Sequence, residues 1–227
     1  MGIQKKQRMM KNVLMTIGML AAIYQLIQTK FVIFPTDMHK SIHLTFCMVI
    51  VFLLHVDFEK KWHHYNNLVS IIGVVASIVA GVYIHINYYT LVNRMGSLNT
   101  MDLIIGITVI AFCLYASWRD WGWTIPVIVL AGISYALFGQ YLPGSWFHAG
   151  VSFKRMVGSA SMYMSGIYGS LLRISAQEVV MFIMFGSVLE ASGGGELFIS
   201  MAKLVSRHLR SGVAQVAVIG SALFGTI

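Results

Sequence analysis

Small residues recur at four-residue spacing in the last apolar run of the sequence. Between Val213 and Ile227, the residues Ala217, Ser221 and Gly225 lie four apart and therefore share one helix face. Such a face lets a neighbouring helix approach closely, which is the packing interpretation. A helix rich in Gly, Ser and Thr can also unwind and present carbonyl and hydroxyl oxygens to a hard cation. Both interpretations fit the spacing.

A glutamate opens another apolar helix, which the sequence predicts over Ile174–Ala191. An ionisable group such as Glu178 at membrane depth is a functional candidate. Ser175 lies three residues before it, and this spacing is typical of a capping box, in which each side chain bonds the other residue's backbone amide. We therefore interpret Ser175 and Glu178 first as a helix cap.

A second glutamate lies close to the end of the same helix. Glu190 precedes a glycine break formed by Gly193, Gly194 and Gly195, and the helix dipole disfavours a negative charge at that end. A cation such as Lys203, or an arginine of another helix, should compensate it. We interpret Glu190 and the glycines as a structural hinge, with a gating role as the alternative.

Histidines provide the remaining metal-binding candidates. His39 and His43 lie one helical turn apart, and His63 is followed directly by His64. Apart from Asp37 and Glu59, neither pair has a Cys, Asp or Glu close enough in sequence to complete a set of metal ligands. We therefore expect ordinary histidines at the membrane interface rather than a metal site. His85, within an apolar run, has the same ordinary interpretation.

No catalytic constellation is present in the sequence. It contains no Gly-x-Ser-x-Gly elbow, no phosphate-binding Gly-Lys-Ser/Thr loop and no carboxylate pair spaced for acid–base chemistry. Cys47 and Cys113 each lie inside an apolar run, which indicates inert packing. We therefore expect neither an enzyme nor a bound cofactor.

The elements that carry these residues must lie in a lipid bilayer. Of the 227 residues, 57% are hydrophobic and only 11% are charged, whereas soluble domains have about a quarter charged residues. The mean hydropathy is +0.75. The formal charge of +8 comes from basic residues between apolar runs, which indicates topology signals rather than nucleic-acid binding.

Uninterrupted apolar runs of this length are helices, because unpaired backbone groups are too costly in hydrocarbon. The fold class is therefore all-α, a polytopic transmembrane protein with interrupted helices in the last third. A first span from about residue 12 to 33 is expected, with Lys30 reaching the interface and Pro35 in the following turn. The further expected spans are Ile42–Val56, Leu68–Ile86, Leu103–Trp118 and Gly122–Leu142.

Basic and aromatic residues at the span ends predict the orientation. Over the first four spans, seven basic residues fall on the N-terminal side and three on the other. The N-terminus is therefore expected in the cytoplasm. Tryptophans at 118, 121 and 123 form part of an aromatic belt.

The character of the chain changes after Leu142. Glycines interrupt the apolar segments, and such breaks are tolerated where backbone is buried in protein or lines a cavity. We expect a four-helix module over residues 1–120 and a second module over 121–227. Two segments, Phe153–Tyr168 and the basic-ended helix Glu196–Arg210, are predicted to lie along the membrane interface.

The last third resembles a known family. It is similar to the large membrane subunit of tripartite ATP-independent periplasmic (TRAP) transporters, above all the fused permease type whose receptor is of the TAXI class. The residues that carry the resemblance are Tyr141–Gly144, Phe182–Gly186, Leu189-Glu190, Ser192–Glu196, Arg210–Val218 and Ser221–Ile227.

The resemblance implies a sodium-coupled secondary transporter for small organic acids. Its partners would be an extracytoplasmic solute receptor, the lipid bilayer and a remaining permease segment or chain, but no nucleic acid. Ser221, Gly225 and Thr226 would lie on the approach to a sodium site, just before a serine-glycine hairpin tip of the family. The chain would then be the N-terminal portion of a permease. The alternative is a non-transporting scaffold, or a truncated remnant, that associates with a partner permease.

Overall fold

The computed structural model describes residues 3–56, 63–94, 96–206, 216–218, 221, 222 and 225. Helices dominate these residues, and no strand occurs among them. Six helical segments are long and apolar enough to cross a membrane: Lys5–Phe31, Thr36–Leu54, Asn66–Asn93, Thr100–Trp121, Thr124–Tyr141 and Phe153–Ala191. The expectation of an all-α, polytopic membrane protein is confirmed.

The chain divides into two compact units, Met1–Glu178 and Val179–Ile227. This division falls well after residue 120, because segments between 153 and 176 pack against the first four helices. The two modules expected from the sequence, 1–120 and 121–227, do not coincide with these compact units. They stay a prediction about which parts of the chain have separate functions.

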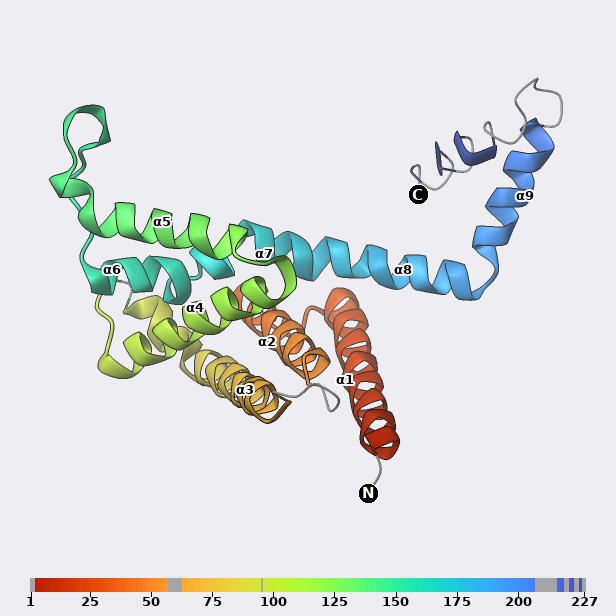
Figure 1. Cartoon of the computed structure of the whole chain (residues 1–227), viewed down its shortest axis with the longest axis horizontal. Coiled ribbons are helices and arrows are strands. Elements are labelled where there is room, and N and C mark those ends of the chain that lie inside the picture. The colour runs from red at the N-terminus through yellow and green to blue at the C-terminus, as the bar shows by residue number, and fades with distance from the viewer. Residues whose placement is uncertain are drawn as a thin grey trace. The chain divides into compact units, whose positions relative to one another are not determined.

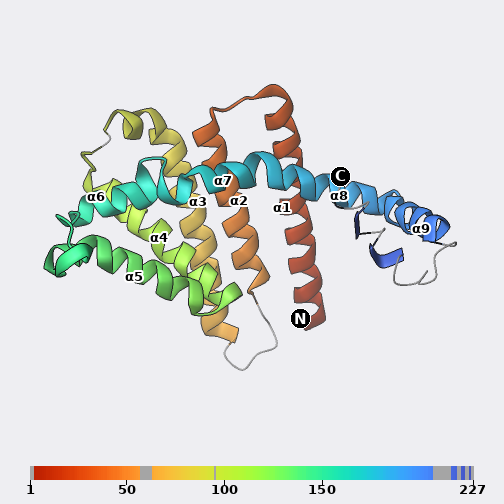
Figure 2. The ribbon, with the colours of Figure 1, turned by 90° about the horizontal axis from the view of Figure 1, so that it is seen from above.

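Four long helices begin the first unit (Figures 1 and 2). They are α1 (Ile3–Phe31), α2 (Thr36–Leu54), α3 (His63–Asn93) and α4 (Thr100–Trp121). Short turns join α1 to α2 and α3 to α4, so the helices of each pair run in opposite directions. All four of the corresponding predicted spans are confirmed as helices.

The turn between α1 and α2 is fixed by one side chain. Gln28 donates to the Phe34 carbonyl oxygen at 2.7 Å and accepts from the Phe34 backbone N–H at 3.0 Å. Val32 in this turn has a φ of +47°, an uncommon conformation for a β-branched residue. The two hydrogen bonds of Gln28 and the predicted turn residue Pro35 together direct the chain into α2.

Helices α2 and α3 approach each other closely at two glycines. A Cβ atom added to Gly81 would clash with Thr45 Oγ1, and one added to Gly73 would lie 2.7 Å from the Phe52 ring. Small residues therefore allow this contact, as is common between membrane helices.

The rest of the first unit contains α5 and a broken segment. Helix α5 (Thr124–Phe138) ends in a 3₁₀ turn, Gly139–Tyr141, and a second 3₁₀ turn covers Gly144–Trp146. The broken segment then consists of α6 (Phe153–Val157), a π turn (Gly158–Met162), a 3₁₀ turn (Gly166–Tyr168), α7 (Ser170–Ile174) and a second π turn (Ser175–Val179).

The broken segment forms part of the core. Met162 and Tyr168 are 1% and 2% exposed and pack with Ala80, Ile84 and Val109 of α3 and α4. Phe153–Tyr168 therefore packs against the bundle through short, irregular helical turns. Its place along the membrane interface stays a prediction.

The second unit contains α8 (Val180–Ala191) and α9 (Gly194–Ser206). Gly193 separates them with a φ of +80°, a conformation in which glycine avoids the strain of other residues. The helix break thus lies at Gly193, whereas Gly194 and Gly195 already belong to α9. Three cations expected at the end of this helix, Arg207, His208 and Arg210, lie outside the described residues.

Candidate functional site

Polar side chains of α1 and α2 meet the second π turn in the interior of the first unit. We call this group the polar cluster. Its members are Tyr24, Gln25, Asp37, His39, Lys40, His43, Tyr168, Ser175 and Ala176. Four of its polar side chains, those of Gln25, His39, Lys40 and His43, belong to residues that are at most 5% exposed.

His39 connects α1 to the π turn. Its Nε2 lies 3.1 Å from the carbonyl oxygen of Ala176, and its Nδ1 lies 3.0 Å from the Tyr24 hydroxyl. A carbonyl oxygen only accepts, so Nε2 carries a proton. In the neutral ring, Nδ1 then accepts from the Tyr24 hydroxyl.

His43 repeats this arrangement one turn along α2. Gln25 donates through Nε2 to His43 Nδ1 at 2.7 Å, and His43 Nε2 lies 3.2 Å from Ser175 Oγ. With Nδ1 accepting, Nε2 carries the proton and donates to the hydroxyl oxygen. The two histidines thus form two parallel connections from α1 through α2 to the π turn.

Lys40, between the histidines in sequence, is a buried cation. Its Nζ lies 2.6 Å from Asp37 Oδ1 and donates to the Tyr168 carbonyl oxygen at 2.5 Å. The Lys40 side chain is 6% exposed and that of Asp37 is 35% exposed. An ammonium group taken out of water needs such partners. The hydrogen bond from Lys40 to the carbonyl oxygen holds the Tyr168 backbone against α2.

The capping box predicted for Ser175 and Glu178 is wrong. The Ser175 backbone is helical, with φ −57° and ψ −46°, and it continues α7 instead of starting a helix. Its hydroxyl bonds His43, and no hydrogen bond between Ser175 and Glu178 occurs among the described residues. The serine is therefore used for a tertiary contact, and π turns of this kind occur frequently at functional sites.

A second buried charge lies at the junction of α3 and α4. Asp102 is fully buried and accepts from the Tyr83 hydroxyl at 2.5 Å and from the Asn99 backbone N–H at 2.8 Å. Arg94 lies 3.5 Å from the same carboxylate. The hydrogen bond that Asp102 accepts from the Asn99 backbone also caps the start of α4.

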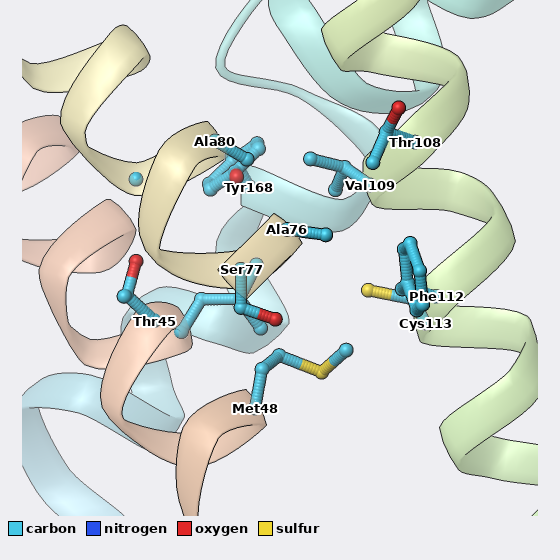
Figure 3. A pocket seen from close by; sticks show the side chains of 12 residues that line it. Thr45, Met48, Ala76, Ser77, Ala80, Thr108, Val109, Phe112, Cys113 and Tyr168 are labelled. Carbon is cyan, nitrogen blue, oxygen red and sulfur yellow. The ribbon is translucent and has the colours of Figure 1, made fainter. Parts of the chain in front are cut away.

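A small cavity lies between α2, α3, α4 and Tyr168 (Figure 3). Its volume is about 20 Å³, enough for about one water molecule. The hydroxyls of Thr45, Ser77 and Thr108 line it, but each donates to a carbonyl of its own helix. The cavity is therefore a packing feature and has no room for an organic substrate.

The predicted sodium-site residues are only partly described. Ser221 is exposed, and its hydroxyl donates to the Val218 carbonyl oxygen at 2.9 Å. Gly225 is helical and has open space around its Cα atom, whereas Thr226 lies outside the described residues. Their role as ligands stays a prediction.

The predicted hinge lines a hollow in the second unit. Glu190 and Gly195 line an open hollow of about 600 Å³ together with Phe182 and Phe185. Within residues 96–206, no ion pair joins Glu190 to Lys203. The hinge therefore stays a prediction, without its expected compensating cation in this part of the chain.

His39 and His43 are buried, because α1 and the π turn cover them, whereas His85 is half-buried. Within the part of the chain that the structure describes, no three His, Cys, Asp or Glu side chains are placed to hold a metal ion. The side chains of His63 and His64, and residue Glu59, lie outside the described residues.

The sequence pattern pointed to His39 and His43 but not to their partners. Gln25, Lys40 and Asp102 were missed. Each is a polar or ionisable residue inside a membrane-spanning helix, and that placement is itself a signal of a buried interaction. The groups that His39, Lys40 and His43 bond in the broken segment lie more than 100 positions away in sequence, so spacing could not connect them.

A model of a known protein family matches about half of the chain. The family model described as "Tripartite ATP-independent periplasmic transporter, DctM component" matches residues 108–227. Neither the curated proteins nor the solved structures gave a significant match to the chain.

Proposed function

Because the chain belongs to the DctM family of tripartite ATP-independent periplasmic (TRAP) transporters, we propose that it is a sodium-coupled, receptor-dependent permease component for small organic acids. The match over residues 108–227 is the observation that carries this proposal. The six apolar helices agree with a multi-pass membrane protein. We further propose a bacterial inner membrane location with the N-terminus in the cytoplasm.

The helices that precede the match would act as a brace. In secondary transporters, one bundle displaces against another around a substrate site. His39, Lys40 and His43 of α2 hold the Tyr168–Ala176 segment, which lies inside the matched region. Such buried, polar connections suit an anchor on which other parts of a permease move.

The proposed coupling ion is sodium, approached by Ser221, Gly225 and Thr226. Sodium is a hard cation that serine and threonine hydroxyls and backbone carbonyls coordinate without a carboxylate. Ser221 Oγ still has lone pairs to accept an ion while it donates to Val218. The substrate would be delivered by an extracytoplasmic solute receptor.

Uptake in proteoliposomes tests the proposal. The full chain would be reconstituted with the solute receptor and any permease segment encoded beside it, and labelled organic acids would be supplied from the receptor side. We expect uptake that requires both an inward sodium gradient and the receptor. No sodium-dependent uptake of any organic acid would refute the proposal, and stable association with a partner permease without uptake would favour a scaffold.

The brace has its own test. His39→Leu removes both hydrogen bonds of the ring, so we expect reduced uptake at unchanged membrane abundance. His148→Leu is the matched control, because His148 bonds Tyr135 and Gly150 near the end of α5, away from the polar cluster. Equal uptake in the two variants would contradict a bracing role.

A further inference from the structure

Helix α1 is longer than one membrane crossing requires. It covers 29 residues, whereas about 20 residues span the hydrocarbon core. Lys11 and Lys30 enclose 18 residues without a charge, which correspond to about 27 Å of helix. The two lysines therefore mark the two headgroup levels of α1, and the helix continues beyond Lys11 into the headgroup region.

A groove opens beside Lys11. It has a volume of about 290 Å³ and lies between the first turns of α1 and the end of α2. Its lining combines Lys11 and Gln7 with apolar side chains, namely Met10, Leu14, Leu53, Leu54 and Val56. One cation at headgroup level beside an apolar wall matches the two parts of a phospholipid, a charged phosphate and an acyl chain.

The charge at this end of α1 favours an anionic lipid. Lys5, Lys6, Arg8 and Lys11 are all exposed, and the first turn of α1 contains no acidic residue. Asp120, the acid that the described residues place at this end of the bundle, pairs with His55 at 3.1 Å. Clusters of four or more cations next to a membrane span attract anionic headgroups.

We propose that the groove between α1 and α2 binds one anionic phospholipid. Lys11 holds its phosphate, and the apolar wall of Leu14, Leu53 and Leu54 receives the upper part of an acyl chain. The other cations at the start of α1 raise the local concentration of such lipids. The bound lipid fills the groove between the two helices.

Native mass spectrometry of the purified full chain tests the site. The protein would be exposed to equal amounts of phosphatidylglycerol and phosphatidylcholine, and the retained lipids counted after gentle removal of detergent. We expect preferential retention of one phosphatidylglycerol, and Lys11→Gln should reduce this preference about fivefold, the effect of one cation at a charged surface. Inorganic phosphate should not displace the lipid.

Two further variants separate the groove from general charge attraction. Lys30→Gln removes a cation at the opposite headgroup level of the same helix, where Lys30 lies over the Phe31 ring, and should leave retention unchanged. Leu54→Trp fills the groove and should displace the lipid without changing charge. Equal loss in Lys11→Gln and Lys30→Gln, or unchanged retention in Leu54→Trp, would overturn the proposal, and neither result depends on transport activity.

Discussion

At the residue scale, the unusual feature is the number of polar groups that α2 buries at membrane depth. His39, Lys40 and His43 each bond a backbone or side-chain group more than 100 residues away. A polar group in a low-dielectric interior is costly unless it is paired. These bonds are therefore obligatory once the helices pack, and they give the contact a single geometry.

The ion pair between Asp37 and Lys40 predicts an asymmetric response to substitution. Asp37→Asn leaves the ammonium, 6% exposed, without its counterion, whereas Lys40→Met leaves a carboxylate that is 35% exposed. We expect Asp37→Asn to cost about 3 kcal/mol of unfolding free energy and Lys40→Met clearly less. The double variant leaves no unpaired charge, so it should be less destabilised than Asp37→Asn, although it still lacks the bond from Lys40 to the Tyr168 carbonyl oxygen.

Thermal unfolding in detergent micelles measures these three variants. Lys30→Met, which replaces an exposed cation of α1, is the control for loss of a lysine alone. A larger loss of stability in Lys40→Met than in Asp37→Asn would contradict the assignment of Lys40 as the buried partner.

At the element scale, glycines decide where helices approach and where they end. The prediction concerns Gly81, where an added Cβ would clash with Thr45 Oγ1. Gly81→Ala should therefore push α2 from α3 and destabilise the bundle by about 1–3 kcal/mol. Gly18→Ala in α1 is the control, because no atom lies within 4 Å of the position that its Cβ would take, and it should be neutral or slightly stabilising.

Combining Gly81→Ala with Thr45→Ala separates crowding from other effects. The double variant removes the opposing hydroxyl and methyl, so most of the lost stability should return. If the double variant is no more stable than Gly81→Ala, then contact with Thr45 is not the reason for the glycine.

The break between α8 and α9 gives a purely conformational prediction. Gly193 has a φ of +80° and no atom near an added Cβ. Gly193→Ala should therefore cost about 1 kcal/mol through backbone strain alone, measured by thermal unfolding. Gly186→Ala in α8, which also has open space but lies within a helix, should not destabilise. Equal effects of the two substitutions would argue against a role for the left-handed conformation.

At the scale of the whole molecule, six apolar segments predict an orientation that labelling can measure. With the N-terminus in the cytoplasm and five crossings before it, Ser152 should face outward. Ser152→Cys in a variant without Cys47 and Cys113 should react with an impermeant maleimide in intact cells. A cysteine at Gly122, between α4 and α5, should react only after the membrane is opened.

The reverse labelling pattern would show that the basic residues do not set the orientation. Failure of both positions to react in opened membranes would instead contradict their place outside the spans. The two cysteines thus test the positive-inside expectation independently of transport.

The sequence by itself determined the membrane environment, the helices and the glycine break. Hydrophobicity and backbone hydrogen bonding in lipid depend on local composition, so α1 to α5 and Gly193 could be predicted from short windows. The family relationship also follows from ordered motifs along residues 108–227.

Only the tertiary structure decided which polar residues act together. Ser175 has the spacing of a helix cap, yet its hydroxyl bonds His43, because the chain returns past α2 and the nearby imidazole is an equally good partner. Phe153–Tyr168 has the composition of an interfacial segment, yet Met162 and Tyr168 fill the core between α3 and α4. Both outcomes depend on contacts between residues that are distant in sequence. A local sequence pattern cannot predict the energies of such contacts.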